Sequence, residues 1–549
     1  MPSRRGADFP PWRWDVPERF NIAVACTDAH LGTPVAGRTA MLVDDAALGA
    51  CQLTFAELAD RSARFAALLA GLGVGPGERV LIRLPNAVTY PVAFFGALRR
   101  GAVAVPTSTL LTADEVVHLA RDSGAAALVT DPASWRAMHA TLVGAPDLRH
   151  VLLTRPTDVP PATVAVHDLD AALTAVARPA DPHPTRADDP AYLVYTSGTT
   201  GYPKGVLHAH RALLGRQPSS EYWFHFRPDG ERVLHSGKLN WTYVLGTGMM
   251  DPLYHGHTAI LWEGPADAAL WPRLIARHAA TTFIGVPTVY RQVLQRTSAG
   301  RADVPTLRHC MSAGEHLSDE VLAGWRRRFG LDVYEGLGMT ECSYYLCQTH
   351  ARPIRPGSAG FVQPGHEVRL LDPQTWREVG VDEEGMLCVP RTDPALFLRY
   401  WNQPEETRLC FHDDWFLTGD YARRDADGYV WFLGRRDDLI NTFGYRVSPH
   451  EIDRVLRDHP DVADCAATGE TVGLDKVLAV AYVVPRPGSA LGAADVLAYG
   501  RRHLASYKCP RIVYLVDELP RTRNGKVLRR DLSPALARAR ASDADVVGP

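Results

Sequence analysis

A glycine- and hydroxyl-rich loop between two apolar stretches constrains the fold of this 549-residue chain more than any other feature. Residues 191–194 are apolar and strand-like, and residues 195–205 read Tyr-Thr-Ser-Gly-Thr-Thr-Gly-Tyr-Pro-Lys-Gly. Residues 206–214 are expected to open a helix. Glycines let the backbone turn sharply, and successive amides in such a loop form an anion-binding concavity. The order of strand, loop and lysine therefore predicts a polyphosphate site.

A flexible surface turn is the alternative for any cluster of Gly, Ser and Thr. The loop does not match the Walker A pattern, because Gly205 rather than Ser or Thr follows Lys204. Lysine usage favours the phosphate site, since a chain that otherwise uses arginine is expected to keep lysine where a compact charge is needed. Only five of the 59 basic residues are lysines, namely Lys204, Lys238, Lys476, Lys508 and Lys526.

Composition excludes several classes of protein. A hydrophobic content of 46%, a charged content of 22% and a net charge of −3 favour an ordinary globular protein without a nucleic-acid or membrane partner. No apolar run is long enough to span a bilayer, and the first residues lack the apolar core of a signal peptide, so a cytoplasmic protein is expected. The nine cysteines are scattered, which favours reduced thiols over a zinc site.

The apolar pattern predicts two or more domains. Residues 54–130 alternate helix and strand patterns, with helices at 55–72, 92–99 and 113–123 and strands at 79–84, 102–106 and 126–130. This alternation is typical of a doubly wound parallel sheet. It resumes at 230–310, with strands at 258–261 and 282–286, after an expected linker at 155–190. Residues 1–50, with Trp12, Trp14 and Phe20, are expected to form an arm packed on the larger body.

The rest of the chain changes character. Residues 331–440 are glycine-rich with short β-like segments, and a smaller α+β unit follows from residue 441. The charged, turn-like stretch 434–438 marks the expected boundary. The predicted fold is α/β, with a large N-terminal domain (1–434) of doubly wound sheets plus a β-rich subdomain, a connection at 435–438 and a small α+β C-terminal domain (439–549).

Six stretches, in order along the chain, resemble the signature motifs of the adenylate-forming superfamily of acyl-CoA synthetases, adenylation domains and luciferases. The first is the opening loop, which resembles the phosphate-binding signature of that superfamily. The others are 312–315, Ser-Ala-Gly-Glu; 336–341, Gly-Leu-Gly-Met-Thr-Glu; 415–420, Trp-Phe-Leu-Thr-Gly-Asp; 434–438 with 444–446; and 520–526, Pro-Arg-Thr-Arg-Asn-Gly-Lys.

The resemblance implies ATP and Mg²⁺ as cofactors. Glu341 would hold Mg²⁺, Asp420 and Arg435 would bind the ribose, and Lys526, Thr340 and Glu341 would form the catalytic set. Each of these residues, taken singly, also has a purely structural alternative. Asp420 would cap a turn, Glu341 would join a surface ion pair and Lys526 would belong to a solvated charged run. The implied ATP-binding residues are Thr196, Ser197, Gly198, Thr199, Thr200, Lys204, Gly314, Glu315, Thr340, Asp420, Arg435 and Lys526.

The resemblance also implies a second half-reaction, in which the acyl group passes from AMP to the thiol of CoA. The small C-terminal domain would be mobile and would rotate about Asp437, presenting Lys526 for one half-reaction and Gly444, Tyr445 and Arg446 for CoA in the other. If the C-terminal domain presents one face to the active site in each half-reaction, its catalytic groups need to lie on a separate, mobile unit.

The acid-binding residues are predicted from position and from side-chain type. Acetate-activating relatives carry Trp where Gly338 stands, so Gly338 leaves room for a larger acid, and the pattern resembles the benzoate and medium-chain acyl-CoA ligases. Leu337 departs from many relatives, which place an aromatic residue against the adenine. Ordinary core is the alternative for each aromatic. The predicted set is Asn240, Trp241, Tyr243, Gly338, Tyr344 and Tyr345.

Three functions stay open on the sequence. The first is an AMP-forming ligase that joins an aryl or medium acyl acid to CoA. The second is an adenylating enzyme whose acceptor is a carrier protein or an amine, including nitrite activation for the diazotisation of an aryl amine. The third is a catalytically silent binding protein, against which the intact Lys526, Glu341 and Asp420 argue. Whether the chain is a homodimer also stays open.

Overall fold

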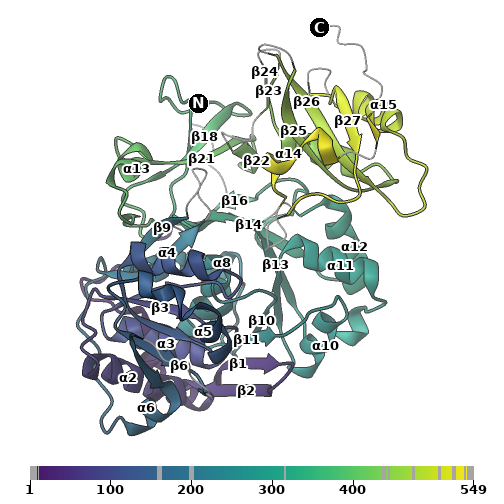
Figure 1. Ribbon diagram of the computed structural model, residues 1–549. Helices are drawn as coiled ribbons and strands as arrows, with labels where there is room; N and C mark the ends of the chain where they lie inside the picture. Colours follow the sequence, from purple (N-terminus) through teal and green to yellow (C-terminus); the bar gives the residue numbers. More distant parts are fainter. Residues whose placement is uncertain are drawn as a thin grey trace.

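The computed structural model places two large sheets in the N-terminal part of the chain and a separate small unit at the C-terminal end (Figure 1). It describes residue 9 and residues 11–156, 163–196, 203–314, 317–435, 440–442, 445–472, 476–504, 508–521, 527–536 and 539–540. The predicted α/β fold class is confirmed. Within the described residues, no helix combines the length and the apolar character that a membrane span requires.

The larger sheet has nine strands in the order β16-β15-β14-β13-β12-β10-β11-β1-β2. Its central strands pair in parallel, as the strand–helix alternation predicts. Helices α10 (Leu270–Arg277), α11 (Pro287–Arg296) and α12 (Asp319–Phe329) bury their apolar faces in one core on it. The strands are β1 (Thr39–Asp45), β2 (Gly49–Thr54), β10 (Arg232–His235), β11 (Thr258–Glu263), β12 (Thr282–Gly285), β13 (His309–Ala313), β14 (Val333–Met339), β15 (Ser343–Cys347) and β16 (Phe361–Val362).

The second sheet has eight strands in the order β19-β9-β8-β4-β3-β5-β6-β7. Its predicted helices and strands appear within one to three residues of their expected bounds. The strands are β3 (Arg79–Arg83), β4 (Val103–Pro106), β5 (Ala125–Thr130), β6 (His150–Leu153), β7 (Ala165–Asp168), β8 (Pro190–Thr196), β9 (Lys204–Ala209) and β19 (Arg399–Tyr400). The helices are α2 (Phe55–Gly71), α3 (Thr89–Arg99), α4 (Ala113–Ser123), α5 (Pro132–Met138) and α6 (Leu169–Ala175).

Local chemistry explains where the helices of this sheet begin. Thr54 caps α2 and Glu57 reaches back to the Thr54 backbone, and Thr112 and Glu115 form the same capping box at α4. Each box satisfies backbone amides that the first helical turn leaves unpaired. The two helix starts were predictable for this reason.

Three expectations about this part of the chain are wrong. Residues 206–214 do not open a helix, because Lys204–Ala209 returns antiparallel to β8 as strand β9, and only a 3₁₀ turn, His210–Arg216, follows. Residues 155–190 are not simply a linker, because they contain β7 and α6, which Asp168 caps. The N-terminal arm ends earlier than expected, since β1 already lies inside the larger sheet.

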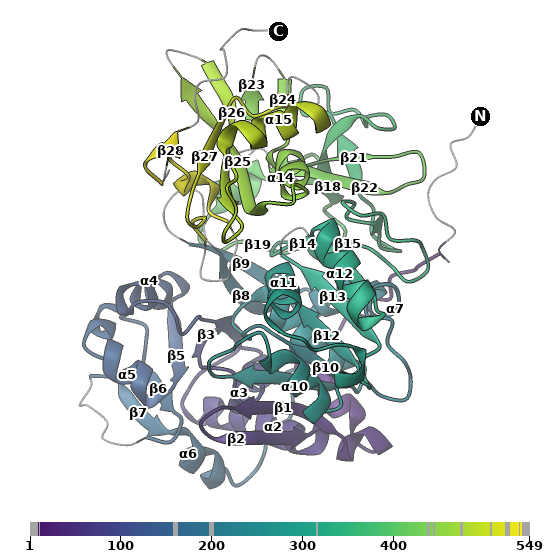
Figure 2. The same cartoon turned by 90° about the vertical axis from the view of Figure 1, so that its right-hand side faces the viewer.

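The remaining strands form the β-rich part and the small C-terminal unit (Figure 2). The β-rich sheet contains β17 (Arg369–Leu371), β18 (Glu384–Pro390), β20 (Phe411–His412), β21 (Trp415–Arg424) and β22 (Val430–Arg435), with α13 (Pro404–Leu409) beside it. The C-terminal unit has its own cores and contains β23 (Ile440–Thr442), β24 (Tyr445–Val447), α14 (Pro449–Arg457), β25 (Val462–Val472), β26 (Lys476–Pro485), α15 (Ala493–His503), β27 (Ile512–Leu515) and β28 (Ala539–Arg540).

Candidate active site

Strands β8 and β9 fix the two ends of the predicted phosphate loop. Thr196 ends β8, Lys204 begins β9, and the two residues face each other in the antiparallel register. The loop therefore leaves and re-enters the sheet at one point. Gly205 follows at a crowded position, because a Cβ there would lie 3.0 Å from the Cβ of Trp401. Ser197, Gly198, Thr199 and Thr200 lie outside the described residues.

Lys204 is joined to Glu341 through one tyrosine. The ammonium Nζ of Lys204 donates to Oε2 of Glu406 at 2.6 Å and lies 5.4 Å from the centre of the Tyr400 ring. The Tyr400 hydroxyl donates to Oε1 of Glu341 at 2.8 Å. Tyr400 belongs to β19, which pairs with β9, the strand that Lys204 begins. Lys204 and the Glu341 carboxylate therefore both contact Tyr400.

The hairpin between β14 and β15 positions Thr340 and Glu341 at its turn. A Cβ on Gly338 would lie 1.9 Å from the Ser343 carbonyl oxygen, so only glycine fits at this bulge in the ladder. Ser343 has φ of +54°, which is uncommon for a residue other than glycine. Burial raises the pKa of the Glu341 carboxyl, and the hydrogen bond from Tyr400 opposes that shift.

Asp420 and Arg435 face each other across β21 and β22. Nε of Arg435 donates to Oδ1 of Asp420 at 3.1 Å, and the Asp420 backbone amide donates to the Thr418 hydroxyl at 3.0 Å. The charges of Arg435 and Asp420 both act on the pKa of Glu341, the first lowering it and the second raising it. The structure therefore brings together four predicted residues, Lys204, Glu341, Asp420 and Arg435, from separate segments.

Aromatic side chains gather on the other side of the β14–β15 hairpin. The ring of Tyr243 lies 5.3 Å from Trp241 and 6.3 Å from Trp223, and Trp223 lies 4.8 Å from Tyr344. A Cβ on Gly314, which has φ of +92°, would lie 3.1 Å from the Trp241 ring. Asn240 is partly exposed beside Trp241. Trp223 was not predicted, since no motif surrounds it.

Tyr345 does not belong to this aromatic group, so a slot that contains both tyrosines is wrong. Successive side chains of a strand point to opposite faces, and Tyr344 and Tyr345 are neighbours on β15. Tyr344 packs with Trp223, whereas Tyr345 packs in the core that contains Tyr400. Its hydroxyl is buried without a hydrogen-bond partner among the described residues, on the side of Asp420 and Glu341.

A buried ion pair that the sequence did not reveal supports Tyr344. Nε of Arg216 donates to Oδ1 of Asp251 at 3.0 Å, with side chains 1% and 4% exposed. The Tyr344 hydroxyl donates to the other oxygen of Asp251. Asp251 directly follows a π-helical turn at Gly246–Met250, and such turns are frequent at functional sites.

Several predicted residues lie outside the described part of the chain or are described by their backbone alone. Glu315, Asp437, Gly444 and Lys526 lie outside the described residues, and only the backbone of Tyr445 and Arg446 is described, as part of β24. Among the residues that the structure describes, no group of three or more His, Cys, Asp or Glu side chains could hold a metal ion alone. The Glu341 carboxylate nevertheless fits Mg²⁺, which commonly uses one or two carboxylates together with substrate phosphates.

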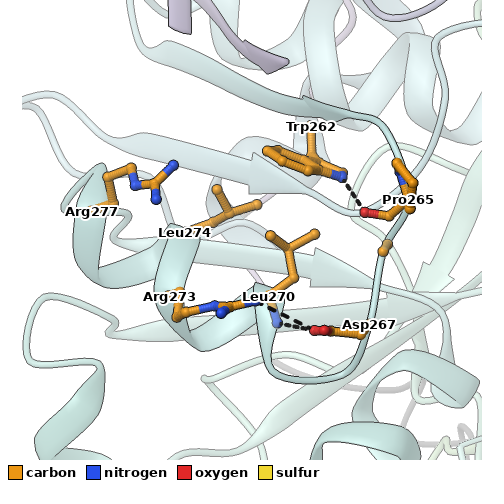
Figure 3. Close-up of a pocket in the computed structure, with 8 residues that line it drawn as sticks. Trp262, Pro265, Asp267, Leu270, Arg273, Leu274 and Arg277 are labelled. Atoms are coloured by element: carbon orange, nitrogen blue, oxygen red, sulfur yellow. Dashed lines mark hydrogen bonds and ion pairs between the residues drawn. The ribbon is translucent and has the colours of Figure 1, made fainter. Parts of the chain in front are cut away.

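A surface pocket of about 420 Å³ beside α10 contains none of the predicted residues (Figure 3). Trp262, Leu270 and Leu274 give it an apolar wall. Its two arginines already have partners, since Arg273 pairs with Asp267 at 3.6 Å and Arg277 with Asp44 at 2.9 Å. The pocket therefore lies apart from the charges gathered around Tyr400.

Comparison with known proteins identifies the family. Residues 32–401 match the family model of the AMP-binding enzymes, and residues 451–526 match that of the AMP-binding enzyme C-terminal domain. The benzoate–CoA ligase of Thauera aromatica is 33% identical over 95% of this chain and 97% of its own length. A 4-hydroxybenzoate–CoA/benzoate–CoA ligase of Rhodopseudomonas palustris is 32% identical over 93% of both chains.

Solved structures agree with the sequence matches. An anthranilate CoA ligase in complex with anthranoyl-AMP superposes with a TM-score of 0.84 at 29% identity, covering 93% of this chain and 96% of that one. A benzoate CoA ligase from Burkholderia xenovorans superposes with a TM-score of 0.82 at 31% identity, covering 93% and 99%. The predicted resemblance to the benzoate CoA ligase branch is confirmed, and the chain belongs to the AMP-binding enzymes of the adenylate-forming superfamily.

Proposed function

We propose that this chain activates an aromatic carboxylic acid with ATP, releases pyrophosphate and passes the acyl group to CoA. The general activity is that of an AMP-forming acid:CoA ligase, in line with its family and relatives. The observation that carries the proposal is the grouping of Lys204, Glu341, Asp420 and Arg435 around Tyr400 and Tyr345, with an aromatic cluster across the hairpin.

The charged residues bind different parts of the nucleotide in this proposal. Lys204 neutralises the β- and γ-phosphates and stays with the departing pyrophosphate, with help from the hydroxyls and amides of Thr196, Ser197, Gly198, Thr199 and Thr200. Asp420 accepts hydrogen bonds from the ribose hydroxyls and Arg435 donates to them. Gly314 and Glu315 line the adenine side.

The acid attacks the α-phosphorus of ATP. Thr340 holds an oxygen of the α-phosphate, and Lys526 stabilises the negative charge that develops on the transferring group. Glu341 would hold Mg²⁺, which supplies charge neutralisation on the phosphates when it is bound. The partly buried position of Glu341 suits this role, because a cation compensates a carboxylate that has lost part of its hydration.

The aromatic cluster supports an aryl acid. Trp241, Tyr243 and Tyr344 offer flat faces and edges to a ring. Gly338 contributes through the tight hairpin and not through open volume, because the Ser343 carbonyl fills the space that a side chain at residue 338 would take. The named relatives act on benzoate, hydroxybenzoates or anthranilate. Tyr345 is left out of the acid site in this proposal, because it lies on the nucleotide side of β15.

Transfer to CoA needs the second face of the C-terminal domain. The strand segment of Gly444, Tyr445 and Arg446 would line the CoA channel after rotation about Asp437. Domain bounds of 1–434, 435–438 and 439–549 are part of this proposal. A carrier protein and an amine are separate proposals for the acceptor, and a homodimer is a separate proposal that a measurement of mass in solution tests.

Pyrophosphate exchange over a panel of acids, with and without CoA, tests the proposal. Benzoate and its hydroxy or amino derivatives are expected to drive exchange and to give the CoA thioester. Exchange without any thioester would move the assignment to an adenylating enzyme with another acceptor. Binding of ATP without exchange for any acid would contradict the proposed reaction.

A further inference from the structure

The ammonium group of Lys204 already has an anionic partner. Its Nζ donates to Oε2 of Glu406 at 2.6 Å, with the lysine side chain 18% exposed and the glutamate 45% exposed. This geometry is that of a close, charge-assisted hydrogen bond. Because the lysine is mostly buried, solvent screens the pair less than it screens an ordinary surface pair.

Glu406 is held in place by its helix. The Tyr400 backbone amide donates to the Thr407 hydroxyl at 3.0 Å, and that hydroxyl donates to the Gln403 carbonyl at 2.9 Å. These bonds tie the first turn of α13 to β19, which pairs with β9, the strand that Lys204 begins. The glutamate is therefore anchored to the same frame as the lysine.

The neighbouring Glu405 has a different environment. It pairs with Arg408 on the same helix at 3.1 Å, with side chains 76% and 70% exposed. No contact among the described residues joins Glu405 to Lys204. The two adjacent glutamates therefore form a natural experimental pair, one bound to the phosphate lysine and one on the solvent side.

A polyphosphate and a carboxylate are both anions, and they need the same ammonium group. Lys204 can keep Glu406 while it binds phosphate only if the two negative charges come close together, which is unfavourable. We propose that Glu406 is a positioning residue that competes with the polyphosphate for Lys204 and thereby lowers the affinity of the site for ATP and pyrophosphate. The proposal rests on the phosphate-binding role of Lys204 in the proposed function.

This competition has a consequence for turnover. Pyrophosphate must leave the site after adenylation, and a carboxylate that recaptures Lys204 favours its departure. The opposite possibility is that Glu406 orients Lys204 toward the phosphates, in which case it raises their affinity. The sign of the change in affinity separates the two.

The test is isothermal titration calorimetry of the full-length protein with MgATP and, separately, with magnesium pyrophosphate. The variants are Glu406→Gln, Lys204→Ala, the double variant and the matched control Glu405→Gln. Removing the competitor is expected to tighten the binding of both ligands about fivefold, the change that corresponds to loss of one partly exposed ion pair. Glu405→Gln is expected to bind as the wild type does.

The Lys204→Ala background tests whether Glu406 acts through Lys204. In Lys204→Ala protein the Glu406→Gln change is expected to have no effect, because the competition acts through the lysine. Unchanged or weaker binding by Glu406→Gln would overturn the inference, and so would equal tightening in both backgrounds. If Lys204→Ala itself binds both ligands as tightly as the wild type does, the phosphate role of Lys204 in the proposed function fails.

Discussion

The proposed nucleotide side and the proposed acid side of the site are built in different ways. On the nucleotide side, Lys204 begins a strand, Arg435 ends one, Glu341 lies at a hairpin turn and Asp420 lies within β21, and each belongs to a short, recognisable stretch of sequence. On the acid side, aromatic rings from distant segments pack together over a buried ion pair. The two sides share the β14–β15 hairpin, whose alternating side chains face one or the other.

The difference lies in what each side must do. Phosphates and ribose present fixed charges and hydroxyls, so a few donors and acceptors at set positions suffice. An acid of variable shape is recognised by the volume and surface of a pocket, which many side chains define together. Substitutions on the two sides should therefore fail differently: loss of catalysis on the nucleotide side, and loss of stability or selectivity on the acid side.

The largest effect is expected at Lys526. Lys526→Ala should lower the rate of adenylation about 10²- to 10³-fold, because it removes the donor that we propose stabilises the transition state. Transfer of a supplied acyl-AMP to CoA should change little. Single-turnover assays of each half-reaction provide the measurement, and an equal loss in both would argue against two alternating faces of the C-terminal domain.

The buried pair on the acid side should be the most sensitive structural element. Asp251→Ala leaves the Arg216 charge buried without its carboxylate and is expected to lower the free energy of unfolding by about 3–5 kcal/mol. Chemical denaturation followed by circular dichroism measures this change. The matched control is Glu18→Gln, which breaks an exposed pair with Arg186 and should cost under about 1 kcal/mol. Similar losses in both variants would contradict the buried network.

Gly338 links the two sides, so a side chain there should disturb both. Gly338→Ala forces a Cβ against the Ser343 carbonyl and is expected to lower the free energy of unfolding by about 1–3 kcal/mol, with loss of adenylation. Gly71→Ala is the control, because a Cβ at the end of α2 meets nothing within 4 Å. Full activity of Gly338→Ala with aromatic acids would rule out the tight hairpin.

A further effect, at His235, whose ring lies 5.0 Å from the ring of Tyr243, appears as a dependence on pH. Burial lowers the pKa of His235 from 6.5 to about 3, so between these values the unfolded chain binds a proton that the folded chain does not. The free energy of unfolding should therefore fall by about 1.4 kcal/mol per pH unit for this group as the pH drops from 6.5.

His235→Gln should remove that contribution. Denaturation of the wild type and the variant between pH 7 and pH 4 measures the two slopes, and the other buried histidines contribute equally to both. The variant is expected to show the shallower slope. Identical slopes would mean that His235 is protonated in the folded chain.

Much of the nucleotide side was predictable because its chemistry is local in sequence. The loop at 195–205 and the segment 336–341 each carry the residues of their proposed function within a few adjacent positions. The helix starts at Thr54 and Thr112 were predictable for the same reason, since a capping box spans four residues.

The proposed acid side was less predictable because it depends on contacts between residues that are far apart in the sequence. Trp223 contacts Tyr344, and Arg216 pairs with Asp251, across 121 and 35 positions of the sequence, so no local pattern reveals these contacts. Tyr345 was misplaced because its type fits a pocket while its face of the strand depends on strand register. Strand β9 was mistaken for a helix start because its short apolar run has no clear period.

The most direct test of the account is the ratio of kcat/KM for CoA thioester formation with benzoate to that with acetate. The aromatic cluster of Trp241, Tyr243 and Tyr344 predicts a ratio well above one, with hydroxy- or amino-substituted benzoates also accepted. A ratio below one, with thioester formed only from short aliphatic acids, would contradict the assignment of Trp241, Tyr243 and Tyr344 to the acid site.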